Sequence, residues 1–197
     1  MPHYQNTGIT NANSLLQGGW KMEVAASAGN LVASSTNIGV GNLISFTENL
    51  VPYAVQAGNA PDPLTGVATH TVTINFETLE FWPPTFDAIR GGGLDTENAA
   101  TAGTYVAGTA NVISTGGLSV LTNKAYRFLN TKLVSSATVQ TAIVVYKGYA
   151  EQGISFTAKG DNDEDPVTVI PWVITGKLDT ARTAGDQLFI IEAEGGA

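Results

Sequence analysis

The chain has 197 residues, of which 43% are hydrophobic and 13% are charged, and its formal net charge is −8. This length suits one domain, or one domain with long arms, and the apolar share is enough for a core. The acidic balance argues against a nucleic-acid-binding protein, which needs basic patches. So few charges protect a surface poorly against self-association, which fits either a self-assembling subunit or simply an uncharged β-domain.

Cysteine is absent, so neither a disulfide nor thiol chemistry is expected. No apolar run approaches the ~20 residues that span a bilayer. The N-terminus lacks the basic start and apolar core of a signal peptide. We therefore expect the chain to be made in the cytosol and not to insert into a membrane.

Charge is spread unevenly along the chain. Residues 1–120 carry eight acids against Lys21 and Arg90, whereas residues 121–160 carry five basic residues against Glu151 alone. An acidic part and a basic part on one chain suit head-to-tail contacts between copies. The alternative is that neighbouring strands neutralise each other within one fold.

The first elements are a polar arm and a strand. Residues 1–19 are rich in Asn, Thr, Gly and Gln, which predicts an N-terminal arm rather than a core element. Apolar and charged residues then alternate over Trp20–Ala26, with Lys21 and Glu23 on the polar side. This period of two predicts a half-buried strand.

A long hairpin follows, formed by extended segments Ile44–Val55 and Val67–Phe81 around the turn-rich tip Gln56–Gly66. In the second segment Val72, Ile74 and Phe76 face one way. The apolar phase slips near Glu77–Thr78, where we expect a β-bulge or a bend. The opposite face is polar and mostly uncharged, and we expect it to point into water; its residues are Thr71, Thr73, Asn75 and Glu77.

The tip is longer than the usual two to five residues of a hairpin connection, so we expect it to have a role. Pro61 and Pro63 limit its freedom before binding, and Tyr53 and Val55 at its base offer apolar area to a neighbour. We therefore expect a contact loop made of Tyr53, Val55, Gln56, Asn59, Pro61, Asp62 and Pro63.

One short helix is expected around Thr85–Ile89, after the two prolines at 83 and 84 and before the glycines at 91–93. We expect it to pack outside the sheet through Phe86 and Ile89. Six further segments are expected to be strands, namely Tyr105–Ile113, Ala125–Leu133, Val139–Tyr149, Ile154–Ala158, Val167–Thr175 and Gln187–Glu192. Because Val167–Thr175 contains Pro171, we expect it to be an edge strand or to carry a bulge. The fold class is thus mostly β, a sandwich or barrel with one short helix, a protruding hairpin and extended arms.

Catalytic and metal-binding patterns are missing from the sequence. The histidines are His3 and His70, and neither belongs to a ligand cluster or a nucleophile elbow. Asp161–Asp165 has the start of a calcium-loop spacing, but Pro166 stands where such a loop needs glycine. We expect this run to be a solvated turn, with adventitious cation binding left open. The sequence predicts no enzyme activity, no cofactor and no metal site.

Two stretches of the chain resemble the major tail tube proteins of long-tailed bacteriophages. The first runs from Ile44–Asn49 through Val72–Phe81 to Phe86–Gly92, and the second from Asp165–Pro171 through Leu178–Arg182 to Ala184–Phe189. The order of elements matches over about two thirds of the chain. The Gly- and Ala-rich segment Ala99–Gly117 departs from the pattern, so an extended loop is expected over 94–117.

The resemblance implies one β-sandwich tail-tube domain over 20–197 that forms stacked, hexameric rings. DNA would pass through the lumen without specific binding, lined by the polar face, while the contact loop reaches the next ring. Partners would be further copies and other tail proteins such as the tape measure, tail tip and terminator, in the virion. Two alternatives stay open, a tube subunit of a contractile tail or secretion apparatus and a monomeric β-sandwich that binds carbohydrate or protein.

Overall fold

The structure is a computed structural model that describes residues 19–55, 64–79, 83–90, 121–134, 137–151, 153, 155 and 169–193. Several expectations from the sequence lie outside these residues. They are the N-terminal arm up to residue 18, the loop over 94–117 with the strand Tyr105–Ile113, the strand Ile154–Ala158 apart from Ser155, and the Asp161–Asp165 turn.

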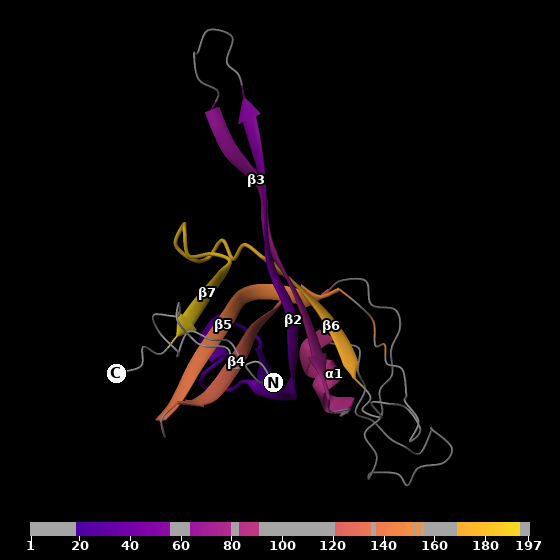
Figure 1. The fold of residues 1–197 in the computed structure, drawn as a ribbon. Coiled ribbons are helices and arrows are strands. Elements are labelled where there is room, and N and C mark those ends of the chain that lie inside the picture. The colour runs from indigo at the N-terminus through magenta and orange to yellow at the C-terminus, as the bar shows by residue number, and fades with distance from the viewer. Residues whose placement is uncertain are drawn as a thin grey trace, which may run out of the picture.

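Strands make up most of the described chain, so the predicted mostly-β class is confirmed (Figure 1). One short α-helix, α1, spans Pro83–Arg90, and a 3-10 turn, η2, spans Ala28–Asn30. The strands are β1 Trp20–Ala25, β2 Thr36–Val55, β3 Leu64–Thr78, β4 Lys124–Val134, β5 Ala137–Ala150, β6 Ile170–Lys177 and β7 Phe189–Ala193.

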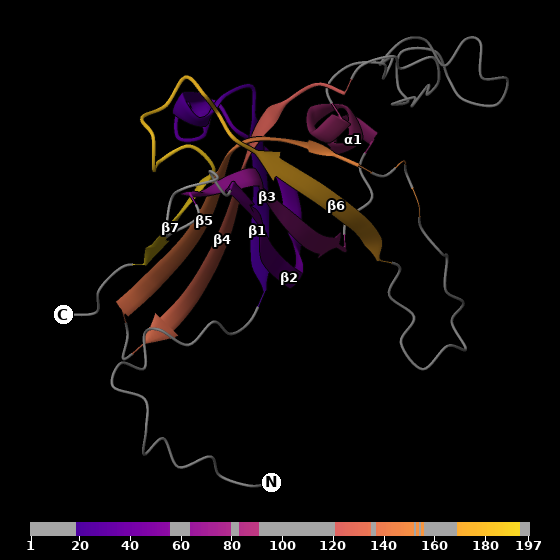
Figure 2. The ribbon, with the colours of Figure 1, turned by 90° about the horizontal axis from the view of Figure 1, so that it is seen from above.

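Six strands close on themselves as an antiparallel barrel in the order β4-β1-β2-β3-β6-β5, because β5 also pairs with β4. Two strands pair with the edge of β5 that faces away from β4. β6 pairs with Gly148–Ala150 at the end of β5, and β7 pairs with Thr141–Val145. Seen from above, the strands enclose a common interior (Figure 2). Pro171 lies in the half of β6 that pairs with β3 but not with β5, as expected for a residue that lacks a backbone donor.

The barrel interior is the main hydrophobic core. The apolar alternation predicted in β3 is confirmed, since Val72, Ile74 and Phe76 are buried. Their partners across the sheet face the same way, with Ile174 opposite Ile74 and Trp172 opposite Phe76. The core is completed by residues from the other elements, among them Trp20, Met22, Val24, Ile38, Tyr126, Phe128, Ile143, Val145, Ile170 and Leu188.

Two β-bulges set the register of the hairpin, and neither lies at the predicted place. Ile44 is an extra residue in β2, and Ala68 is an extra residue in β3. The first bulge lets Leu43 and Phe46, three residues apart, face the same core, which an unbroken strand with its period of two would not allow. Of the bulge or bend expected near Glu77–Thr78, the bulge is wrong, because β3 stays in regular register with β6 up to Thr78, whereas the chain does bend at the next residue, Leu79.

The predicted helix exists, and the two side chains expected to anchor it are buried. Phe86 and Ile89 are fully buried and belong to the main core cluster. The Phe86 ring packs on Trp172 at a centroid distance of 5.0 Å, and the Tyr126 hydroxyl donates to the Ile89 carbonyl at 3.1 Å. The helix therefore packs on the core through these two residues.

We expect Phe86→Ala to lower the free energy of unfolding by about 3 kcal/mol or more, because it removes a buried ring and leaves a cavity. Urea denaturation followed by tryptophan fluorescence measures this. Leu79→Ala is the control, since Leu79 is 47% exposed and should change stability by less than about 0.5 kcal/mol. A similarly small loss for Phe86→Ala would contradict the burial of the helix.

Candidate assembly surface

The hairpin β2–β3 extends well beyond the barrel (Figure 1). Within the barrel, β1 pairs with β2 only over Thr36–Gly41, and β6 pairs with β3 only over Thr71–Thr78. Residues Leu50–Val55 and Leu64–His70 thus form a two-stranded ribbon that pairs with no further described strand. A two-stranded ribbon is marginally stable alone in water, so this part of the chain favours a partner.

The outer face of the hairpin near the barrel is polar and almost uncharged. Residues opposite each other share a face, so Ser45, Thr47 and Asn49 of β2 lie beside Asn75, Thr73 and Thr71 of β3. The Asn75 amide donates to the Ser45 hydroxyl at 2.7 Å, and the Asn49 amide donates to the Thr73 hydroxyl at 3.1 Å. Thr71, Thr73, Asn75 and Glu77 are half-buried and lie outside the core. Their position in a tube lumen stays a prediction.

The same face becomes apolar toward the tip of the ribbon. Val51, Tyr53 and Val55 are each about half exposed, at 52%, 50% and 53%. Tyr53 lies across Gly66 on the facing strand, where a Cβ atom would come within 2.6 Å of the tyrosine ring. Gly66 therefore allows the ring to lie close against the ribbon. One face of the hairpin is thus polar near the barrel and apolar at its exposed end. The polar part, formed by Ser45, Thr47, Asn49, Thr71, Thr73 and Asn75, is called the polar wall.

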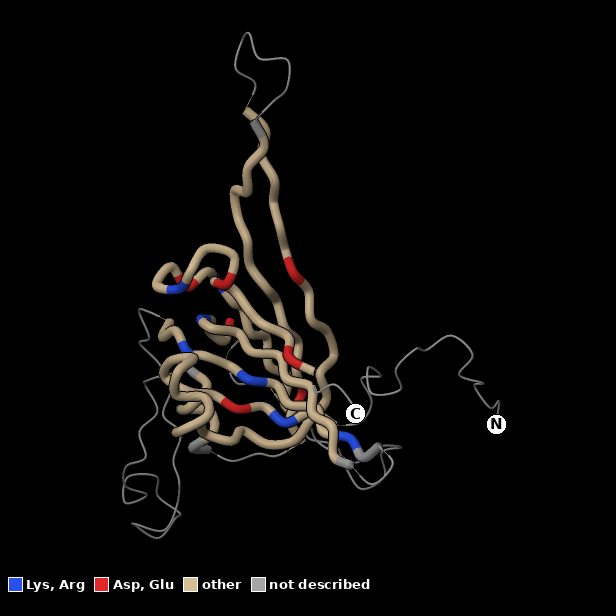
Figure 3. The backbone as a smooth tube through the Cα atoms, turned by 90° about the vertical axis from the view of Figure 1, so that its left-hand side faces the viewer, with Lys and Arg blue, Asp and Glu red and all other residues tan. Residues whose placement is uncertain are grey.

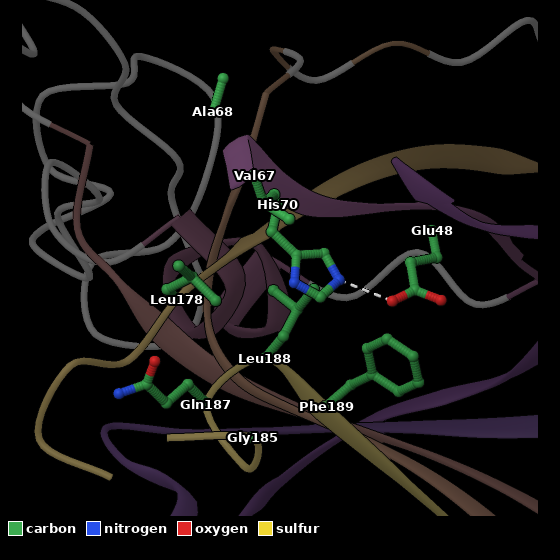
Figure 4. A pocket seen from close by; sticks show the side chains of 9 residues that line it. All are labelled: Glu48, Val67, Ala68, His70, Leu178, Gly185, Gln187, Leu188 and Phe189. Carbon is green, nitrogen blue, oxygen red and sulfur yellow. Dashed lines mark hydrogen bonds and ion pairs between the residues drawn. The ribbon is translucent and has the colours of Figure 1, made fainter. Parts of the chain in front are cut away.

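The other face of the ribbon carries a close contact between His70 and Glu48 and a cavity at its root. His70 Nε2 lies 2.6 Å from Glu48 Oε1, beside Leu50. A cavity of about 310 Å³ opens there between the hairpin and the chain around Gln187 and Phe189 (Figure 4). The Phe46 ring meets Phe189 edge-on at 5.0 Å, so the root of the hairpin rests on an aromatic contact.

The segment after β6 is held beside this cavity by contacts with β5 and within itself. The Tyr146 hydroxyl donates to Asp186 Oδ1 at 2.6 Å, and the Arg182 guanidinium donates to Asp186 Oδ2 at 2.6 Å. Arg182 also lies 3.7 Å from the centre of the Tyr146 ring. Burial and the hydrogen bond to Asp186 raise the pKa of Tyr146 to about 12. The hydrogen bonds from Tyr146 and Arg182 in turn hold the pKa of Asp186 below its ordinary range.

Charged side chains are scarce on the protruding ribbon. Among the described residues, 49–55 and 64–76 contain no Lys, Arg, Asp or Glu, and the charged positions in Figure 3 lie on the barrel and at the hairpin root. A surface without charge is easily desolvated, because no ion has to leave water. The ribbon is therefore suited to burial against another protein surface.

The predicted contact loop is only partly described. Tyr53 and Val55 lie at the exposed end of the ribbon, as expected for residues at the base of the tip. Gln56, Asn59, Pro61, Asp62 and Pro63 lie outside the described residues. The prediction omitted Leu50, Val51 and Val67, which are 50%, 52% and 49% exposed on the same ribbon. The alternation of Val51, Tyr53 and Val55 in the sequence was the signal that could have identified Val51.

Nothing in the described residues forms a metal site or a membrane-crossing helix. No three His, Asp or Glu side chains of this part of the chain come together as metal ligands. No helix in the same part is long and apolar enough to cross a bilayer.

No protein-family model matches the sequence, and no curated protein matches it. Among solved structures, the chain is similar to the anti-feeding prophage cap, described as a tube-terminating cap, with a TM-score of 0.41, 8% identity and 88% of each chain covered. It is also similar to an Hcp protein, with a TM-score of 0.34, 8% identity, 89% of this chain and 99% of that chain. Both likenesses are too loose to carry an argument about function.

Proposed function

We propose that this chain is a structural subunit that assembles with copies of itself into stacked rings, forms the tail tube of a long-tailed bacteriophage and needs no cofactor. The observation that carries the proposal is the uncharged two-stranded ribbon that leaves a closed barrel with exposed apolar residues at its end. Such a ribbon is unsuited to a monomer, because its open edges and apolar side chains invite pairing.

The ribbon would reach the neighbouring ring, and burial of Val51, Tyr53 and Val55 there would stabilise the stack. Each apolar side chain transferred from water contributes roughly 1.5 to 3 kcal/mol when fully buried. Repeated around a ring, even partial burial of three residues per copy gives a cooperative contact. Other tail proteins, such as the tape measure, tail tip and terminator, would meet the ends and the inside of the tube.

The polar wall of the hairpin would line a lumen through which DNA passes. Threonine, serine and asparagine side chains hydrogen-bonded to one another offer DNA phosphates few cations to bind. Glu77 adds repulsion. Lys177 lies opposite Thr71 at the edge of this wall and within 5.6 Å of the Tyr149 ring, where the aromatic face engages its charge.

Negative-stain electron microscopy of the purified chain at high concentration tests the proposal. Rings or tubes are the expected result. Isolated small particles at every concentration, together with a monomer mass in analytical ultracentrifugation, would overturn it.

Lysine substitutions separate the two ends of the hairpin face. Thr73→Lys should leave tube formation unchanged, because the new side chain would extend into water in the lumen. Val51→Lys should abolish tubes, because burying a lysine at the contact would require desolvating its charge. Tube yield measured by sedimentation compares the two variants. Loss of tubes with Thr73→Lys would show that the polar wall is itself a packed interface.

A further inference from the structure

Tyr53 and Gly66 face each other across the protruding ribbon, as a directly opposed pair of β2 and β3. A Cβ atom on Gly66 would lie 2.6 Å from Cε1 and Cζ of the Tyr53 ring and 2.7 Å from its hydroxyl oxygen. These atoms are the outer end of the side chain, so the ring reaches across to the facing strand and lies over Gly66. Tyr53 is nevertheless 50% exposed. The ring thus rests on its own ribbon and still offers half of its surface to a partner.

The backbone at position 66 does not itself require glycine. The φ angle of Gly66 is not in the positive range that favours this residue. Gly41, in contrast, is closed to a Cβ atom by the Glu77 carbonyl oxygen of the facing strand. At Gly66 the three nearest atoms all belong to the Tyr53 side chain. A backbone oxygen is fixed, whereas a ring can rotate away, so a larger residue at position 66 would displace the ring and leave the strands in place.

We propose that Gly66 is a positioning residue that holds Tyr53 in one orientation as the anchor of the contact between copies. The proposal rests on the self-assembly proposed above and names how one residue of that contact is prepared for binding. Gly66 itself supplies no apolar side chain to the contact. It acts through the ring that it allows to lie across the ribbon.

A ring that is held in place before binding loses less entropy when it docks. A tyrosine that is free to rotate about its side-chain torsions has to be ordered on docking, which lowers the affinity. Tyrosine is also among the residues that carry most of the binding energy of protein interfaces. Val51 and Val55 lie on the same face, and residues 49–55 and 64–76 contain no Lys, Arg, Asp or Glu. Docking of the ring therefore requires no charge to leave water.

Gly66→Ala separates positioning of the ring from stability of the fold. Alanine is favoured over glycine within a strand, so the free chain should unfold at an unchanged or slightly higher temperature. Displacement of the ring should raise the protein concentration needed for tubes about three- to tenfold, the range expected when one side chain has to be ordered on binding. Gly29→Ala is the matched control, because a Cβ atom there meets nothing within 4 Å, and it should leave this concentration unchanged.

A change at Tyr53 shows whether Gly66 acts through the ring. Tyr53→Val keeps an apolar residue that favours strands but removes the ring that lies over Gly66. This variant should also need a higher concentration to form tubes, and adding Gly66→Ala to it should cause no further increase. A further increase of the same size in the double variant would mean that Gly66 acts independently of the ring, which would overturn the proposal.

The place of the ring can be measured by NMR in the dilute chain, without assembly. The ring should shift the signals of the Gly66 Hα protons, and Tyr53→Val should abolish this shift. Unshifted signals in the wild type would overturn the positioning and leave the proposed function standing. Shifted signals in a wild type that forms no tubes at any concentration would overturn the proposed function and the anchor role with it.

A soluble paramagnetic agent tests whether the ring is open to a partner. It should broaden the Tyr53 ring signals of the dilute chain, because the residue is half exposed. Ring signals that resist broadening would show that the chain's own residues cover Tyr53, and the anchor role would then be wrong.

Discussion

Replacing residues 57–65 by a two-residue turn should leave a folded, soluble chain that no longer forms tubes. The barrel core lies away from the end of the ribbon (Figure 1), and shortening a surface loop costs little free energy. The tip and the apolar residues at its base are, under our proposal, the contact with the next ring. The deletion would remove that contact while leaving β1 and β4–β7 untouched. Circular dichroism and thermal unfolding report the fold, and electron microscopy reports tubes.

A second variant separates the sequence of the tip from its length. Exchanging residues 57–65 for nine Gly and Ser residues keeps the reach of the hairpin but removes Pro61, Asp62 and Pro63. It should also fail to form tubes, because a flexible tip loses more entropy on docking. Normal tubes from the shortened chain would rule out the contact. Normal tubes from the Gly and Ser variant alone would show that the tip acts only as a spacer.

The second large effect is expected at Glu23 on β1. Its carboxylate is 5% exposed and accepts hydrogen bonds from Lys21 Nζ at 2.6 Å and from Arg127 Nε at 2.6 Å. Glu23→Gln removes the charge and leaves Arg127, whose side chain is 19% exposed, without its counter-ion. Breaking a buried ion pair by removing one partner costs several kcal/mol. We expect a loss of about 3 kcal/mol, the lower end, because Lys21 remains partly solvated.

The Glu23 contribution should depend on pH. Burial alone would raise the pKa of Glu23, but the hydrogen bonds from Lys21 and Arg127 outweigh it and hold the pKa below its ordinary value of 4.5. A lowered pKa means that the stabilisation is complete above pH 4.5 and is lost as the pH falls through the folded-state pKa. Urea titrations at several pH values should therefore show the wild type and Glu23→Gln converging in acid.

Glu48→Gln makes the same chemical change at an exposed position. The Glu48 side chain is 46% exposed and pairs with His70, and exposed pairs contribute at most about 1 kcal/mol. A gap between wild type and Glu23→Gln that stays constant down to pH 3 would show that the carboxylate does not titrate with folding.

Alternation in the sequence predicted much of β1, β3, β4 and β5 and the core-facing residues of β3. The β3 pattern held because both neighbouring strands bury the same face of Val72, Ile74 and Phe76. The same reasoning missed the first part of β2, because the predicted extended segment began at Ile44 and the strand begins at Thr36. Gly41 is needed there because a Cβ atom would lie 1.7 Å from the Glu77 carbonyl oxygen, so close strand contact requires glycine.

Features that depend on pairing between distant strands could not be predicted from the sequence. Glu23 was assigned to the polar side of its strand, and its burial follows from Arg127, which lies opposite it on β4. A partner so distant in the chain leaves no local pattern. The candidate surface was predicted in part for the same reason. Tyr53 and Val55 were found by their place beside turn residues, whereas the cavity at the root of the hairpin depends on the segment around Gln187.

Closure of the barrel makes its last strand pairings long-range in sequence. Trp20 lies opposite Asn130 and Thr73 opposite Thr175, so the pairings that complete the ring join residues more than 100 positions apart. The hairpins β2–β3 and β4–β5 join near neighbours, and such hairpins form within about 1 to 10 µs, whereas distant pairings are slow. Each newly made chain therefore carries its ribbon with open edges before the barrel is closed. Crowding of unfinished chains should favour mispairing between ribbons, and dilution should favour the native ring of strands.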